Sequence, residues 1–329
     1  QITFFPNGHL VGSSIIEIII SYPGRKSIRI LTTGDYHNRN LFFPVEKIPA
    51  LFRQEPYSVV LCESTYGDIN SSDKKFLPVF KKDIEKAITN EQKIVIPSFA
   101  TGRTQEILYL LKQMQDEKKL PEDIEIWLAG GTAQEMTRRF CYEALGFYPH
   151  MKQFLPKNFH MMPKKQQAKI LETLFNSSKS CIIISPSGMA DHGSITSIIP
   201  KSLARSDVLI YFPGYCTTSS KGYQIMNLEL GDKMYYSGKQ YEKKCEVKFT
   251  GEISAHAKRD ELLDFLKSMA TPKAIIVGHG EPRTREAFIE YLSKKIPETR
   301  CENLDPDFGF EITSDGISKI IPANFEFFN

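Results

Sequence analysis

The chain has 329 residues, 41% of them hydrophobic and 25% charged, with a net charge of +3 at pH 7. This length can bury one large core or two ordinary domains, and the composition is typical of a soluble globular protein. The net charge is too small to indicate a polyanionic partner by itself, so any basic surface would have to be local.

The sequence also indicates in which cellular compartment the protein is expected. No apolar run approaches the ~20 residues of a membrane-spanning helix, and no secretory signal is visible. The six cysteines are scattered without a Cys-x-x-Cys pair, which favours free thiols in a reducing compartment. We therefore expect a cytoplasmic protein with no membrane contact. Since Gln1 is not a normal initiator residue, either something was removed before it or the chain begins inside a longer one.

Short apolar runs rich in branched side chains alternate along the chain with segments of helical spacing. Such runs are typical of strands buried on both faces, and their alternation with helices predicts α/β layers. In chain order, the predicted strands are 28–31, 59–61, 94–96, 124–128, 181–184, 208–212 and 274–277, and the predicted helices are 77–89, 104–117, 164–175, 258–269 and 284–296.

Two polar, turn-rich stretches, 66–75 and 235–244, are candidate domain crossings. If both are crossings, the middle of the chain is an inserted domain and the two ends form one body. Two consecutive domains would fit the same pattern.

Acid and histidine motifs recur at the ends of the predicted strands. His9 lies between two glycines, which permit close backbone approach, and Asp35 follows the strand at 28–31. His and Asp at strand ends can converge as ligands of a divalent metal ion. Taken singly, His9 could be a surface residue and Asp35 a turn or helix-capping residue.

Three further residues extend this series. Glu63 should emerge at the carboxyl end of a strand, where ligands gather in open α/β sheets, although it could simply mark the strand's exit. His256 directly precedes the helix predicted at 258–269, whose N-terminus favours an anion such as phosphate. His279 follows the strand at 274–277 and precedes Gly280-Glu281-Pro282. Either histidine alone would be weak evidence.

Two small-residue loops could hold phosphate. Pro97-Ser98-Phe99-Ala100-Thr101-Gly102-Arg103 joins a predicted strand to a helix, and Ser185-Pro186-Ser187-Gly188-Met189 follows another strand. Backbone donors and a guanidinium suit a phosphodiester, which makes Ser98, Arg103, Ser187 and Gly188 candidate substrate-binding residues. The same loops would also serve as tight connections.

In order, these motifs closely resemble those of the β-CASP branch of the metallo-β-lactamase superfamily, which includes the cleavage-and-polyadenylation endonuclease and archaeal and bacterial ribonucleases. The resemblance runs from His9 to Glu281. It implies a metallo-β-lactamase αββα sandwich built from residues 1–69 and 249–329, with its N-terminal part missing. Residues 70–248 would form an inserted α/β β-CASP domain that covers the active-site cleft.

The resemblance also implies a role for each site residue. His9 would bind a first zinc ion, Asp35 would bridge two zinc ions, and His279 would bind the second. His256 would lie near the scissile phosphate as proton donor or charge stabiliser, with Glu63 orienting it. Asp35, Glu63 and His256 are accordingly the expected catalytic residues.

One departure from the family is serious. None of the seven histidines belongs to a His-x-His-x-Asp-His cluster, which in the family supplies four further ligands upstream of the residue matching His9. His9, Asp35 and His279 alone would hold at most one metal ion with an incomplete shell. The absent front strands of the sandwich would leave an unpaired sheet edge.

Three explanations of this departure are open. The chain is a fragment or truncated product, or one half of a split enzyme whose partner chain brings the cluster, or a non-catalytic member that binds RNA or acts as a scaffold. The five retained motifs favour the first two.

We therefore expect a zinc-dependent endoribonuclease that acts on single-stranded RNA. It would be complete only with the missing segment, supplied by a partner chain or within a homo-oligomer. The alternative is a catalytically silent RNA-binding or scaffolding subunit of an RNA-processing complex. Hydrolysis of DNA or a small ester is a third reading, because metal chemistry alone does not select the substrate.

Overall fold

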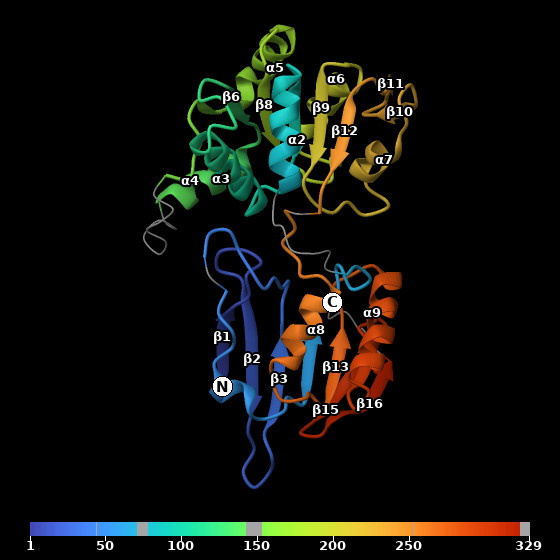
Figure 1. The fold of residues 1–329 in the computed structure, drawn as a ribbon. Helices are drawn as coiled ribbons and strands as arrows, with labels where there is room; N and C mark the ends of the chain where they lie inside the picture. The colour runs from blue at the N-terminus through green and yellow to red at the C-terminus, as the bar shows by residue number, and fades with distance from the viewer. Residues whose placement is uncertain (44, 71–77, 143–152, 252, 323–329) are drawn as a thin grey trace. The chain divides into compact units, whose positions relative to one another are not determined.

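A computed structural model describes residues 1–43, 45–70, 78–142, 153–251 and 253–322. The chain divides into two compact units (Figure 1): unit 1 comprises Gln1–Asp73 and Ala255–Asn329, and unit 2 comprises Lys74–Ser254. The expected domain limits of 69/70 and 248/249 lie close to these divisions. Both units combine helices with a sheet, which confirms the predicted α/β class.

Unit 1 is organised around a mixed sheet. Its first three strands are antiparallel, and the other three continue the sheet in parallel. Because β3, β4 and β13 are parallel, their carboxyl ends meet at one edge of the sheet. In the described residues the sheet has six strands, in the order β1 (Ile2–Pro6), β2 (Ser14–Ile20), β3 (Ile28–Thr32), β4 (Val59–Cys62), β13 (Ala274–Val277) and β14 (Arg300–Asn303).

The core of unit 1 lies between one face of this sheet and the helices α8 (Arg259–Lys267) and α9 (Pro282–Lys295). Leu31, Leu262 and Phe288 are fully buried there. The opposite face is covered over β4 and β13 by the hairpin of β15 (Phe308–Thr313) and β16 (Gly316–Pro322). A short helix, α1 (Ala50–Arg53), precedes β4.

The edge strand β1 leaves apolar side chains in solvent. Ile2 and Phe4 are 62% and 65% exposed, and Ile2 is in register with Ile18 of β2. Isoleucines occupy both faces of β2, since successive side chains of a strand point to opposite sides. Within the described part of the chain β1 pairs with β2 alone, so this edge of the sheet is unpaired.

Unit 2 is built on an entirely parallel sheet. Its central strands are continuous apolar runs whose side chains are buried on both faces, as such sheets require. In the described residues the sheet has six strands, in the order β12 (Glu246–Phe249), β9 (Val208–Phe212), β5 (Lys93–Pro97), β8 (Cys181–Ser185), β6 (Glu125–Leu128) and β7 (Phe159–Met161).

Helices connect the parallel strands of unit 2 and bury their apolar faces against the sheet. A small hairpin of β10 (Lys233–Tyr236) and β11 (Lys239–Glu242) completes the unit. All the carboxyl ends of the strands lie at one edge of the sheet. The α-helices are α2 (Pro78–Thr89), α3 (Arg103–Asp116), α4 (Gly131–Tyr142), α5 (Gln167–Asn176), α6 (Ile199–Leu203) and α7 (Lys221–Asn227), with 3-10 turns at Lys164–Gln166 and Ser194–Ser197.

All six cysteines lie in described ranges and are free, and Cys62, Cys181, Cys216 and Cys245 are buried. Burial raises the pKa of Cys181 and Cys216 to about 12, so these thiols stay protonated near neutral pH. In the described ranges no helix has the length and apolarity to cross a membrane.

Candidate metal centre

The loop that carries His9 is anchored to the end of β3 by the buried side chain of Asn7. The Asn7 amide nitrogen donates to the Thr33 carbonyl (3.0 Å), and its amide oxygen accepts from the His9 backbone N–H (3.2 Å). Gly8 adopts a positive φ of 77°, and a Cβ atom there would lie 2.1 Å from the His37 carbonyl oxygen. The glycine before His9 is therefore required by close backbone approach.

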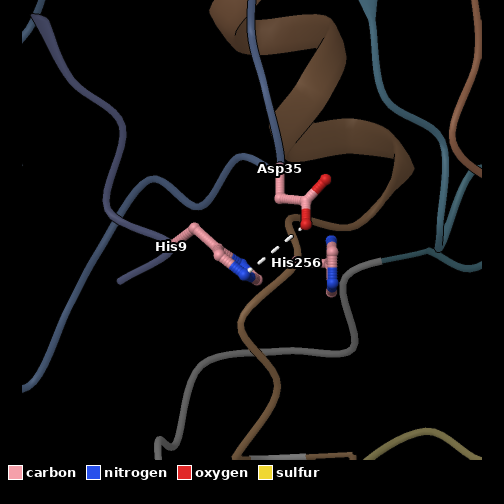
Figure 2. Close-up of side chains that lie close together, drawn as sticks. All are labelled: His9, Asp35 and His256. Carbon is pink, nitrogen blue, oxygen red and sulfur yellow. Dashed lines mark ion pairs between the residues drawn. The ribbon is translucent and has the colours of Figure 1, made fainter. Parts of the chain in front are cut away.

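The orientation of His9 is fixed through one ring nitrogen. Its Nδ1 lies 3.0 Å from the Ala255 carbonyl oxygen. Because a carbonyl only accepts, Nδ1 carries the proton and the lone pair is on Nε2. Nε2 lies 3.6 Å from Oδ2 of Asp35, and the two side chains point toward each other in Figure 2.

Asp35 follows β3 and contacts two histidines through different oxygens. Oδ1 lies 3.1 Å from Nε2 of His279, and Oδ2 faces His9. The carboxylate is 35% exposed, so a ligand from solvent can reach it. Its two oxygens are thus directed at separate imidazoles.

Glu63 emerges at the carboxyl end of β4, and its buried carboxylate orients His256. Glu63 Oε2 and Oε1 lie 2.8 and 3.0 Å from Nδ1 of His256. The backbone N–H groups of Tyr36 and Thr65 also donate to this carboxylate. A carboxylate on Nδ1 is common among metal-binding histidines, in which Nε2 is the ligand atom.

The imidazoles at 9, 256 and 279 lie together. The His256 ring is 4.7 Å from that of His9 and stacks on that of His279 at 5.6 Å, measured between ring centroids. His279 has a left-handed backbone with a φ of 46°, and its carbonyl accepts from the Ser64 N–H and the Thr65 hydroxyl. Five motifs that are distant in sequence therefore converge at the carboxyl edge of the unit 1 sheet.

The donor atoms of this cluster fit a metal ion. His9, Asp35 and His256 each offer one ligand atom, and these atoms lie within 4.8 Å of one another. Figure 2 shows the three side chains around one point. Imidazole nitrogen and carboxylate oxygen are donors that zinc prefers, and the contacts from Ala255 and Glu63 orient both rings. His279, the ligand implied by the family resemblance, contacts Asp35 beside this group.

In unit 2 the structure brings together the two loops predicted to bind phosphate. The Ser98 N–H donates to the Ser185 carbonyl (3.0 Å), so the loops after β5 and β8 lie side by side. Ser98 and Ser187 are 1% and 6% exposed. The Ser187 N–H donates to the His192 carbonyl, and its hydroxyl accepts from the His192 N–H. The predicted donors are thus largely engaged within the loops.

Arg103 opens α3 and forms an ion pair with Glu106, one turn along the helix. Its side chain is only 11% exposed. Burial raises the pKa of Glu106 to about 7, although the neighbouring Arg103 guanidinium acts in the opposite direction. A phosphate bound by Arg103 would therefore share the guanidinium with the Glu106 carboxyl group.

Sequence reasoning missed three contributors to these sites: Asn7, the Ala255 carbonyl and Glu106. Asn7 reads as an ordinary turn residue after Pro6, and a backbone carbonyl leaves no sequence signal. Glu106 lies three residues after Arg103 on a helix, a spacing that indicates a pair but not its burial.

The chain matches two models of known domains. Residues 104–225, which lie within unit 2, match the Beta-Casp domain. Residues 240–301 match the Zn-dependent metallo-hydrolase RNA specificity domain. This second match points to zinc and to RNA.

Known relatives cover most of the chain. It is 29% identical to an RNase J-like protein of Methanocaldococcus jannaschii, over 89% of this chain and 67% of the relative. It is 26% identical to ribonuclease TTHA0252 of Thermus thermophilus, over 85% and 63%. It is 25% identical to the transcription termination factor FttA of Methanosarcina mazei, over 92% and 48%. The chain thus spans about half to two thirds of the length of these relatives.

Proposed function

Because the chain belongs to the β-CASP branch of the metallo-β-lactamase superfamily, we propose that it is a zinc-dependent endoribonuclease. Unit 1 would be the partial metallo-β-lactamase domain and unit 2 the β-CASP domain. The observation that carries this proposal is that Asp35 contacts His9 and His279 through separate oxygens, with the His256 ring 4.7 Å and 5.6 Å from their rings. The site would be complete only with a His-x-His-x-Asp-His segment, supplied by a longer chain, a second copy or a partner.

His9, Asp35 and His279 would hold zinc, with Asp35 bridging two ions in the complete site. When bound, zinc would lower the pKa of a water molecule and stabilise charge on the phosphate. The Asp35 oxygens face two imidazoles, which supports the bridging role. The Ala255 carbonyl keeps the Nε2 lone pair of His9 directed at this point.

His256 would move the proton in the reaction. Its contact with Glu63 holds one proton at Nδ1. A second proton at Nε2 would be given to the departing oxygen of the RNA, a contribution worth about 10²–10⁴-fold in rate. The buried Glu63 carboxylate fixes the orientation of the ring through both of its oxygens.

In unit 2, Ser98, Arg103, Ser187 and Gly188 would contact the RNA backbone, without reading its sequence. Single-stranded RNA is the proposed substrate. The match to an RNA specificity domain supports RNA over DNA.

The test combines zinc analysis with cleavage of a single-stranded RNA. The chain is assayed alone and with a co-expressed segment carrying the His-x-His-x-Asp-His cluster. We expect zinc retention and turnover only with the segment, both lost on chelation, and a fall of about 10²–10⁴-fold in turnover for His256→Ala.

His160→Asn is the matched control, because His160 lies on β7 of unit 2, in contact with Trp127. Turnover that survives chelation or the His256 substitution would eliminate this mechanism. RNA binding with neither zinc nor turnover, even with the segment, would instead identify a silent RNA-binding subunit.

A further inference from the structure

Three loops at the carboxyl edge of the unit 2 sheet are linked into one surface. They follow β5, β8 and β9. The Gly222 N–H donates to the Met189 carbonyl (2.7 Å), and the Lys221 N–H donates to Oδ1 of Asp191 (2.7 Å). The N–H of Ser98 joins the first loop to the second. Hydrogen bonds between loops make this edge a preorganised surface.

Phe99 is exposed at this edge although its neighbours are buried. The residue is 44% exposed, whereas Ser98 and Thr104 are 1% and 0% exposed. Its carbonyl accepts both the backbone N–H (3.2 Å) and the hydroxyl (2.7 Å) of Thr104. The backbone that carries the ring is therefore fixed, so the ring is presented to solvent from a rigid position.

The ring of Phe99 packs against Gly188. A Cβ atom at Gly188 would lie 3.0 Å from Cδ2 and 3.1 Å from Cε2 of Phe99. The ring therefore rests against the backbone of the second loop, in the space that a side chain would fill. The φ of Gly188 is not positive, so the close approach of Phe99, through its ring and its backbone nitrogen (3.1 Å), is what calls for glycine here.

A second exposed aromatic ring lies on the same edge. Phe249 ends β12 and is 51% exposed, in register with Phe212 at the end of β9. β5 is the other neighbour of β9. Strands are about 4.8 Å apart, so the ends of β12 and β5 are separated by roughly 10 Å. The two exposed rings thus follow or end the strands on either side of β9, and the loop after β9 leads to Lys221 at the start of α7.

We infer that Phe99 stacks on an unpaired base of single-stranded RNA, and that Gly188 also positions its ring. This inference rests on the proposed function and adds a base contact to it. Aromatic rings beside polar and basic groups are the usual platform for single strands, because every base has a stacking face that a duplex covers. Stacking tolerates any base, so little sequence preference is expected.

The test measures RNA binding by the full chain in EDTA, which separates binding from metal-dependent hydrolysis. The probe is a short oligouridine with one 2-aminopurine, whose fluorescence is quenched on stacking. We expect Phe99→Leu to weaken binding by about 5- to 100-fold and to abolish the quenching. Phe99→Tyr should retain both. Gly188→Ala should weaken binding by a smaller factor, because the ring must shift.

Tyr235→Leu is the matched control, since Tyr235 is 68% exposed on the β10–β11 hairpin, and it should bind like the unsubstituted chain. Equal affinity and quenching for Phe99→Leu and the unsubstituted chain would overturn the inference, as would an unsubstituted chain that does not bind the probe. Ring-dependent binding by a chain that never cleaves RNA, even with the cluster-bearing segment, would refute the proposed function alone.

Discussion

The two units place their candidate functional groups in the same way but use them differently. In each, parallel strands lead into site residues at the carboxyl edge of a sheet, although His9 and His256 of unit 1 do not follow parallel strands of its sheet. In unit 1 the ionisable side chains at that edge point toward one another, and backbone groups such as the Ala255 carbonyl orient them. In unit 2 the polar side chains are engaged within their own loops, and aromatic rings are left in solvent.

This difference shows that a shared position on a sheet does not fix the chemistry. Metal binding needs several donors whose proton positions are set, and unit 1 sets them through Glu63 and Ala255. Binding of a flexible polymer without sequence preference needs a rigid surface but few precisely placed side chains. The hydrogen-bonded loops of unit 2 form such a surface. Changes in unit 1 should therefore affect catalysis, and changes in unit 2 should affect RNA affinity or local stability.

The most direct test of this difference between the units is the substitution Glu63→Gln. A neutral amide orients Nδ1 of His256 less strongly than the two carboxylate oxygens do. Turnover of the chain assayed with the cluster-bearing segment should therefore fall by about 10- to 100-fold. RNA affinity in EDTA should not change, because no unit 2 residue is altered. Single-turnover cleavage and fluorescence anisotropy measure the two effects.

Glu302→Gln serves as the control for Glu63→Gln, because Glu302 pairs with Arg300 on β14 rather than with a histidine. An unchanged rate, or a parallel loss of RNA affinity, would contradict the assignment of Glu63 to His256 orientation.

An effect on stability rather than on turnover is expected for Asn7→Ala, which removes the anchor of the His9 loop. The Thr33 carbonyl and the His9 N–H would lose their buried partner, at a cost of about 3 kcal/mol. The unfolding of unit 1, followed by exchange of the β3 amides, should shift to lower urea concentration. Trp127 is the only tryptophan and lies in unit 2, so its fluorescence should report an unchanged transition there.

In that experiment Ser21→Ala provides the comparison, because the Ser21 hydroxyl bonds only to that of Ser27 at an exposed site. Equal stability of the Asn7→Ala and Ser21→Ala chains would show that the His9 loop does not depend on Asn7.

The sequence was most informative where burial is complete. The strands predicted at 94–96, 181–184 and 208–212 are strands in the structure, because a continuous branched run suits a sheet covered on both faces. The strand Arg300–Asn303 and the helix Gly131–Tyr142 escaped prediction, since polar residues obscure their patterns. Tertiary pairing with β13 makes Arg300–Asn303 a strand.

At the candidate site, the sequence indicated which residues would meet but not how they would be held. Asp35, Glu63 and His279 each follow an apolar run, so their meeting at a strand edge could be expected. The bond of His9 to the Ala255 carbonyl depends on chain segments 246 residues apart, and no local pattern predicts it. Likewise, the Arg103–Glu106 pair could be expected from spacing, whereas its burial depends on packing within unit 2.

The burial of Glu106 predicts a pH dependence of stability that is confined to unit 2. The pKa of Glu106 is about 7 in the folded chain against an ordinary value of 4.5, so the folded state holds this proton more tightly than the unfolded state. The contribution of Glu106 to stability is then fully present below pH 4.5 and is lost as pH rises toward 7. Between pH 5 and 7 the loss is about 2 kcal/mol.

Glu106→Gln cannot ionise, so its unit 2 stability should lack this slope, as measured by urea unfolding with Trp127 fluorescence at pH 5 and 7. Glu135→Gln, at an exposed pair with Arg139, should keep the slope of the unsubstituted chain. If the slope persisted in Glu106→Gln, the carboxylate would have to be ionised throughout. Arg103 would then be held by a permanent ion pair at neutral pH, and RNA phosphate would have to displace a full charge to reach it.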